Sequence, residues 1–314
     1  MRDVGEVCTK ENNTMTSKQS EAIRDHWGAM TEAARANPDQ TPEEVRERVE
    51  KYWPALTGEP GGVDYLEAEV AGLPALWAVP KGGAEDRVIF SVHGGGGVSG
   101  SIYTHRKLFG HLAKAAGARA LLTEYREEQH PAPLEDTTAA YRWLLDQGID
   151  ARHIAVAGDS IGGGLSVATM LRARELGLPT AAAVLLMSPF VDMTVSNQTF
   201  ETNRDTERFF YKEVVAALAA MYLGGTDPKD PLASPLYADL SGLPPTYIQV
   251  GGDETLLGDS LQFDENARKA GVDVQAEVFA GQLHTFQMAA GYSPESDDAI
   301  QKLAAWVRPK LGLP

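Results

Sequence analysis

Cysteine is almost absent from this chain of 314 residues. The one cysteine, Cys8, excludes an intramolecular disulfide, and we expect it to be an idle thiol. Long hydrophobic runs are missing too, because no segment reaches the ~18 consecutive apolar residues of a membrane span. The stretch from Met1 to Ser20 lacks the apolar segment of a secretory signal. We therefore expect a cytoplasmic protein that has no membrane partner.

Basic residues are too few to balance the acidic ones. The chain has 28 Lys and Arg against 44 Asp and Glu, which gives a formal net charge of −16. Nucleic acids and anionic membranes both favour basic surfaces, so this balance argues against both as partners. A Walker phosphate loop is also missing, and the glycines at 94–97 and 162–164 lack the spacing of a dinucleotide fingerprint. The histidines show no zinc-binding pattern, so we expect neither a metal nor a cofactor.

The chain does have a regular alternation of short apolar runs with amphipathic stretches. This pattern predicts an α/β protein with a mostly parallel central sheet and helices on both faces. The expected strands are 63–70, 73–79, 88–92, 118–124, 154–157, 183–187, 246–250 and 273–279. The expected helices between and after them are 105–116, 134–147, 165–176, 259–270 and 297–311.

Two segments fall outside that alternation. Apolar residues at helical spacing predict two N-terminal helices, the second beginning at a capping box, Thr41-Pro42-Glu43-Glu44. The alternation stops again between Val191 and Leu243, where one helix, 212–223, is expected. We therefore predict an N-terminal helical segment at 1–57, a catalytic domain at 58–314 and, within it, an insertion at about 192–240.

A G-x-S-x-G pattern, Gly158-Asp159-Ser160-Ile161-Gly162, lies between an expected strand and an expected helix. The pattern alone is weak in a chain with 31 glycines. Its position gives it meaning, because a serine nucleophile needs a strained strand-to-helix turn that only glycines leave room for. Ser160 is therefore the candidate nucleophile.

A second glycine motif, His93-Gly94-Gly95-Gly96, follows the expected strand at 88–92. Acyl transfer creates an oxyanion, which backbone N–H groups must stabilise. Glycines allow the backbone to approach a substrate closely, so this loop is expected to supply one or two donors. The residue after the nucleophile, Ile161, would supply another.

A base and an acid are then required downstream of the serine. Of the seven histidines, only His284 follows Ser160, and it lies shortly after the expected strand at 273–279. Two adjacent carboxylates, Asp253 and Glu254, follow the preceding strand, and only one of them can orient the imidazole. The residue pattern alone leaves the choice between them open.

Six motifs in this order resemble the hormone-sensitive-lipase-like branch of the α/β-hydrolases, in its bacterial carboxylesterase form. They are HGGG, GDSIGGG, SPFVD, DPLASPLYADLSGLPP, GGDETLLGDS and HTF. The similarity runs from about Gly61 to the C-terminus, and the paired N-terminal helices resemble the cap of that family. The resemblance implies an α/β-hydrolase fold with a helical cap, and an esterase that needs no cofactor.

Carried over by motif, the resemblance makes Ser160 the nucleophile and His284 the base, with His93 bracing the glycine loop. The oxyanion hole would consist of the N–H groups of Gly94, Gly95 and Ile161. The family's acid begins an acid-x-Leu pattern thirty residues before the histidine, which selects Glu254 over Asp253.

Two departures from the family concern substrate size. Ile161 stands where the family has alanine, and the segment from Tyr125 to Asp136 is three residues shorter than its counterpart. Both predict a crowded pocket and short acyl groups. We also expect the pocket to be apolar and roofed by the N-terminal helices and the insertion.

The expected function is hydrolysis of short-chain carboxylic esters, with a small-molecule ester as the partner. Two alternatives remain open: a lactone or activated-amide hydrolase with the same triad, and a non-catalytic ligand-binding protein on a hydrolase scaffold. Receptors of the second kind tend to lose the histidine, which this chain keeps. Members of the family often dimerise, so a homodimer is the candidate assembly.

Overall fold

The computed structural model describes residues 16–37 and 40–314 of the chain. Cys8 and the first fifteen residues of the predicted N-terminal segment lie outside the described residues. One eight-stranded sheet is formed by this part of the chain, in the order β1-β2-β4-β3-β5-β6-β7-β8. The strands are β1 (Val63–Val70), β2 (Leu73–Pro80), β3 (Ala84–Val92), β4 (Ala118–Thr123), β5 (Ile154–Asp159), β6 (Ala183–Met187), β7 (Thr246–Gly251) and β8 (Val274–Phe279).

The sheet is parallel from β4 to β8, and only β2 runs antiparallel to its two neighbours. Right-handed crossovers place the helix after β3 on one face and the helices after β4, β5 and β7 on the other. The described helices are α1 (Lys18–Ala36), α2 (Pro42–Tyr52), α3 (Ile102–Ala116), α4 (Ala132–Asp146), α5 (Ile161–Glu175), α6 (Thr199–Thr202), α7 (Lys212–Leu223), α8 (Leu257–Lys269) and α9 (Pro294–Val307). Helix α3 packs against α9, and α4 packs against α5. The predicted α/β architecture is confirmed.

Several elements differ from their predicted bounds, among them β3 and α9, and two helices begin earlier than predicted for an identifiable physical reason. Helix α5 begins at Ile161, four residues earlier than expected, although glycines 162–164 weaken a helix. A Cβ on Gly162 would lie 2.2 Å from the carbonyl oxygen of Val92, so these glycines let α5 lie directly on the sheet. Helix α3 begins at Ile102 because Ser101 and Thr104 form a capping box. The short α6 was not predicted.

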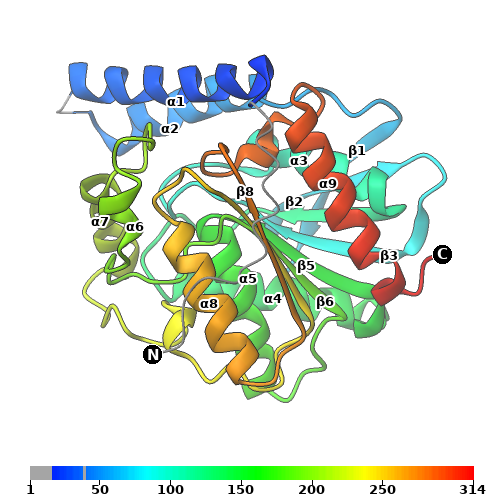
Figure 1. Cartoon of the computed structure of the whole chain (residues 1–314). Coiled ribbons are helices and arrows are strands. Elements are labelled where there is room, and N and C mark those ends of the chain that lie inside the picture. The colour runs from blue at the N-terminus through cyan, green and yellow to red at the C-terminus, as the bar shows by residue number, and fades with distance from the viewer. Residues whose placement is uncertain (1–15, 38–39) are drawn as a thin grey trace.

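The N-terminal helices α1 and α2 lie side by side across one end of the sheet, next to α6 and α7 (Figure 1). Helix α1 turns an apolar side inward, with Ile23, Trp27 and Met30 buried. The carboxyl ends of β3 and β5 meet beneath these helices. The helices that follow β3 and β5 lie on opposite faces of the sheet, and ligands of such sheets bind at the carboxyl ends of the two strands concerned. None of the described helices is long and apolar enough to span a membrane.

Candidate active site

Ser160 occupies a sharp turn between β5 and α5. Its backbone has φ 53° and ψ −124°, a conformation that an L-residue adopts only under constraint. The turn is held because the Ser160 N–H donates to the Met187 carbonyl at 3.0 Å and the Ser160 carbonyl accepts from the Phe190 N–H at 2.9 Å. A Cβ on Gly158 would lie 2.2 Å from the Gly162 carbonyl, so both glycines of the motif are required.

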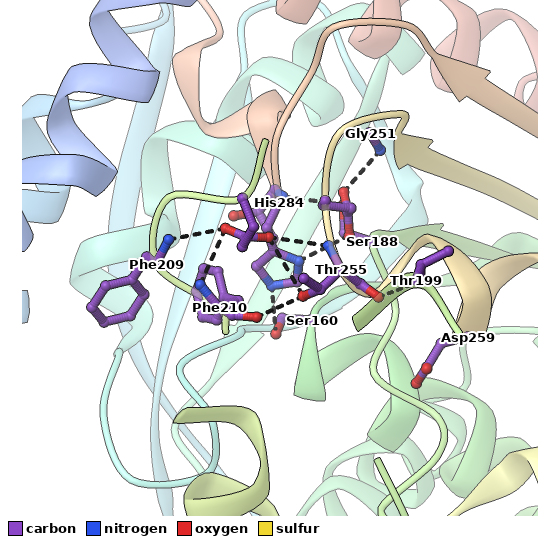
Figure 2. Close-up of polar contacts among 12 residues, drawn as sticks. Ser160, Ser188, Thr199, Phe209, Phe210, Gly251, Thr255, Asp259 and His284 are labelled. Carbon is purple, nitrogen blue, oxygen red and sulfur yellow. Dashed lines mark hydrogen bonds and ion pairs between the residues drawn. The ribbon is translucent and has the colours of Figure 1, made fainter. Parts of the chain in front are cut away.

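Three predicted side chains meet at this turn. The Nε2 of His284 lies 2.9 Å from the Oγ of Ser160, and its Nδ1 lies 3.1 Å from Oε1 of Glu254. Both His284 and Glu254 are buried. If Nδ1–H donates to the carboxylate, Nε2 is free to accept the proton of the serine hydroxyl. Figure 2 shows the imidazole directly beside Ser160.

The two adjacent carboxylates point in different directions. Oε2 of Glu254 accepts hydrogen bonds from the Ser188 hydroxyl at 2.7 Å and the Gly251 N–H at 2.8 Å, which leaves Oε1 for the imidazole. Asp253 faces outward and forms an ion pair with Arg24 of α1. The geometry therefore agrees with the motif register that selected Glu254.

Ser188 is a site residue that sequence reasoning missed. It follows β6 and has a backbone φ of 46°. Its hydroxyl donates to Glu254 and accepts a hydrogen bond from the backbone N–H of Thr285 at 3.1 Å. It thus connects the acid to the residue that follows the candidate base. The available signal was the SPFVD motif, which supported the resemblance without being given a role.

The glycine loop, residues 93–100, differs in one respect from expectation. The N–H of Gly94 donates to Oδ1 of Asp159 at 3.0 Å, so in this structure it is taken by a carboxylate and not left for an oxyanion. Among the described residues, the N–H groups of Gly95 and Ile161 have no acceptor. Ile161 begins α5, whose first amides have no partner within the helix. The role of Gly95 and Ile161 as donors stays a prediction.

Two histidines lie behind the glycine loop. The ring of His93 stacks on Tyr125 at 4.3 Å between centroids, and its Nδ1 lies 2.8 Å from the Gly94 carbonyl oxygen. Burial, helped by the neighbouring His105, lowers the pKa of His93 to about 3, so this ring is neutral and suited to bracing the loop. His105, which no motif singled out, is buried, and its Nε2 lies 3.4 Å from Oδ2 of Asp159.

A cavity of about 310 Å³ opens onto Ser160 and His284. Its walls are largely apolar and come from both segments that were predicted to roof it. The N-terminal part contributes Met30, Ala34, Val45, Val49 and Trp53, and the insertion contributes Phe209, Phe210, Val214, Val215 and Leu218.

Both features that predicted a crowded pocket lie elsewhere. The lining formed by the described residues includes neither Ile161 nor any residue from 125 to 136. The side chain of Ile161 is buried, and Tyr125 supports the glycine loop by donating from its hydroxyl to the His93 carbonyl at 2.9 Å. The expectation that these residues narrow the pocket was wrong, because they pack behind the site.

Proteins of known family are similar to this chain in sequence and in fold. The family model for the alpha/beta hydrolase fold matches residues 89–288. An acetyl-hydrolase of Streptomyces hygroscopicus is 36% identical over an alignment of 288 positions, which covers 85% of this chain and 96% of that one. A crystal structure of an esterase from the bacterial hormone-sensitive lipase family has 41% identity and a TM-score of 0.88, covering 95% of this chain and 100% of the other. Another, of EstE5 soaked with p-nitrophenyl butyrate, has 35% identity and a TM-score of 0.88, covering 94% of this chain and 99% of the other.

Proposed function

The chain belongs to the α/β-hydrolase fold family, in its hormone-sensitive-lipase-like branch, and is a carboxylic ester hydrolase; from this premise we propose that it is a serine esterase that forms an acyl-enzyme on Ser160. The observation that carries the proposal is the continuous contact from Ser160 through His284 to Glu254. It is the arrangement that a hydroxyl needs to become a nucleophile near neutral pH.

The reaction has two halves. Ser160 Oγ attacks the ester carbonyl carbon while Nε2 of His284 takes the hydroxyl proton. The carbon–oxygen bond to the alcohol then breaks, and His284 gives that proton to the leaving oxygen. In the second half a water molecule attacks the acyl group with His284 as base, the acid leaves, and Ser160 regains its proton.

Glu254 and the glycine loop act on the charges that develop. The Glu254 carboxylate stabilises the imidazolium of His284 and is itself held by Ser188 and Gly251. The N–H groups of Gly95 and Ile161 would donate to the oxyanion, and that of Gly94 would join them only by releasing Asp159.

The N-terminal segment and the insertion would together form a cap. We propose the boundaries expected from the sequence, with a cap segment at 1–57, a catalytic domain at 58–314 and a cap insertion at about 192–240. Residues from both segments line the cavity above Ser160, which supports this division. The assembly of two copies stays a prediction, which light scattering of the purified chain would test.

Short-chain esters are the proposed substrates. At about 310 Å³ the cavity is near the lower end of ligand-site volumes, which begin at about 300 Å³. Its apolar lining favours an acyl chain until the space is filled. A solved relative soaked with p-nitrophenyl butyrate is consistent with this substrate class.

The decisive experiment compares Ser160→Ala with Ser241→Ala, a serine on the exposed surface. Ser160→Ala should lower kcat on p-nitrophenyl butyrate by at least about a thousandfold, because serine and histidine act as a unit in such triads. It should also abolish covalent labelling by a fluorophosphonate. A Ser160→Ala variant that retains turnover or labelling would overturn the proposal. Lactones and anilides in the same assay would separate the ester reaction from the alternative activities.

A further inference from the structure

Glu207 is a buried carboxylate outside the triad, in the loop between α6 and α7. Only 1% of it is exposed. Its Oε1 accepts three consecutive backbone N–H groups, those of Arg208 at 2.8 Å, Phe209 at 3.0 Å and Phe210 at 3.1 Å. A buried charge is costly unless hydrogen bonds compensate it, and successive amides that converge on one oxygen do so.

The other oxygen of Glu207 reaches the loop that carries Glu254. Oε2 accepts the backbone N–H of Thr255 at 3.1 Å. The Thr255 hydroxyl lies farther away, at 3.5 Å, and its single proton goes to the Phe210 carbonyl at 2.6 Å. Because Thr255 directly follows Glu254, one carboxylate fastens the insertion to the acid of the triad.

Phe210 is the residue that this arrangement places. Its N–H is bound to Glu207 and its carbonyl to Thr255, so its backbone is held at both ends. Its ring lies 4.2 Å from the ring of His284, centroid to centroid, and lines the cavity. Figure 2 shows Phe210 and Thr255 close to the imidazole.

The same loop also contacts the N-terminal helix. Trp27 of α1 stacks on Phe209 at 5.7 Å with an interplanar angle of 24°, and the Thr31 hydroxyl donates to the Arg208 carbonyl. A chain of contacts therefore runs from α1 through the loop to the acid and base.

We propose that Glu207 is a positioning residue for catalysis, which fixes Phe210 against His284 and ties the insertion to the acid loop. The proposal rests on the triad proposed above, because its effect is exerted through His284 and Glu254. Glutamine cannot replace Glu207 in this place. Its one carbonyl oxygen serves either the three amides or Thr255, and its NH₂ group then faces N–H donors on the other side.

The test is Glu207→Gln, with Glu201→Gln as the matched control. Glu201 lies in the adjacent α6 on the surface and pairs with Lys212, so the control makes the same change of charge without touching the loop contacts. Active sites are counted by the p-nitrophenol burst, so that kcat is expressed per competent site. A residue that only supports folding would lower the number of sites and leave kcat unchanged.

We expect Glu207→Gln to lower kcat per site roughly tenfold to a hundredfold, the effect of misplacing a catalytic group by about 1 Å. KM for the acetate ester should change far less, because the substitution alters the placement of His284 and Glu254 and so small an acyl group gains little binding from the pocket wall. Glu201→Gln should behave as the unaltered enzyme. Unchanged kcat per site in Glu207→Gln would overturn the proposal.

A second pair of variants covers the case in which Glu207→Gln does not fold. Thr255→Val removes the hydroxyl that binds the Phe210 carbonyl, whereas Thr255→Ser keeps a hydroxyl at this position. The valine variant should lose kcat and the serine variant should regain most of it; equal kcat in the two would overturn the proposal. Should Ser160→Ala remain active, the proposed function fails instead, whatever these variants do.

Discussion

On one side of Ser160 the glycine loop is held by close backbone packing and by one carboxylate, that of Asp159, whereas on the other side the acid loop, residues 251–256, is held mainly by hydrogen bonds from distant side chains. A Cβ on Gly95 would lie 1.8 Å from the Ser99 carbonyl oxygen, and one on Gly100 would lie 2.4 Å from the Gly94 carbonyl oxygen. Only hydrogen atoms fit at these positions. Both residues also have positive φ, 126° and 88° respectively.

The acid loop has such crowding at Gly251, where a Cβ would lie 2.4 Å from the Gln282 carbonyl oxygen, but Glu254 and Thr255 carry full side chains. Its parts are fixed by hydrogen bonds from segments far away in the sequence. Ser188 reaches Glu254 across 66 positions, and Glu207 reaches Thr255 across 48. Asn203 adds two bonds from its amide, to the carbonyls of Gly252 at 3.0 Å and Glu254 at 2.9 Å.

The difference predicts how each side fails. A substitution in the glycine loop acts through local sterics and moves the backbone donors. A substitution around the acid loop acts through lost charge or lost hydrogen bonds, and it can do so from a distance. Four substitutions test this contrast, and we give them in order of decreasing expected effect.

The largest loss of kcat is expected in the acid loop, for Glu254→Ala. Removing the acid that orients the histidine costs about 10⁴-fold in kcat in well-studied triads. Asp253→Ala removes only a partly exposed ion pair with Arg24, worth roughly 1 kcal/mol or less, and should keep kcat within about fivefold. Steady-state kinetics on p-nitrophenyl butyrate distinguish the two. The reverse ranking would move the role to Asp253.

Among substitutions in the glycine loop, Gly95→Ala should show the largest loss of kcat. The added methyl cannot fit against the Ser99 carbonyl, so the loop must move and the Gly95 N–H with it. Loss of one oxyanion donor costs about 10²- to 10³-fold in kcat. Gly61→Ala is the control, because its Cβ would meet open space. Near-normal kcat in Gly95→Ala would show that the loop is not held by packing.

The glycine side could be predicted from sequence more fully than the acid side, and the reason is physical. Close approach of two backbone segments requires glycine, so the glycines in the sequence mark where such an approach occurs. The strand at 183–187 and the order of strands and helices were predicted for a similar reason, because apolar periodicity follows from burial on the sheet.

Hydrogen bonds between distant segments leave no such mark. A serine at 188 or a glutamate at 207 is as common on a surface as in a site, and only the fold brings them to Glu254 and Thr255. The bond between the Gly94 N–H and Asp159 could not be predicted either, because it depends on how β3 and β5 end next to each other. The prediction that Ile161 narrows the pocket was wrong because the direction of its side chain depends on the early start of α5.

Leu218 allows the pocket to be enlarged without changing a residue of the glycine loop or of the acid loop. It lies on α7, lines the cavity and is the side chain that a Cβ on Gly96 would meet at 2.8 Å. Leu218→Ala should move the best acyl chain longer by one or two methylenes, each worth about fourfold in kcat/KM. Met221→Ala, exposed on the same helix, is the control. An unchanged chain-length profile in Leu218→Ala would contradict the proposed acyl pocket, and a shift in Ile161→Ala would restore the interpretation made from sequence.

Glu124 is a carboxylate that lies beside His93, behind the glycine loop. Its Oε2 accepts the N–H of Ile102 at 3.0 Å, and its Oε1 lies 3.7 Å from Nε2 of His93. Burial raises the pKa of Glu124 to about 7, with the carboxylates of Glu127 and Glu50 adding to the effect and His105 opposing it. His93, with its pKa lowered to about 3, stays neutral through this range and does not offset the change.

The smallest predicted effect is therefore a change in how stability depends on pH in Glu124→Gln. An unfolded glutamate has a pKa of about 4.3, so between that value and about 7 the folded chain holds a proton that the unfolded chain has lost. Unfolding in this range therefore releases a proton, so the free energy of unfolding falls as pH rises. The stabilising contribution is complete below about pH 4.3 and is lost as pH rises through about 7. Glutamine removes this slope, so Tm measured from about pH 5 to about pH 8 should fall less steeply in the variant, by roughly 2 °C over the range. Asp259, whose pKa burial also raises to about 7, is present in both chains and cancels from the comparison. Parallel Tm curves would mean that Glu124 stays ionised, and the glycine loop would then lie against a second charged carboxylate besides that of Asp159.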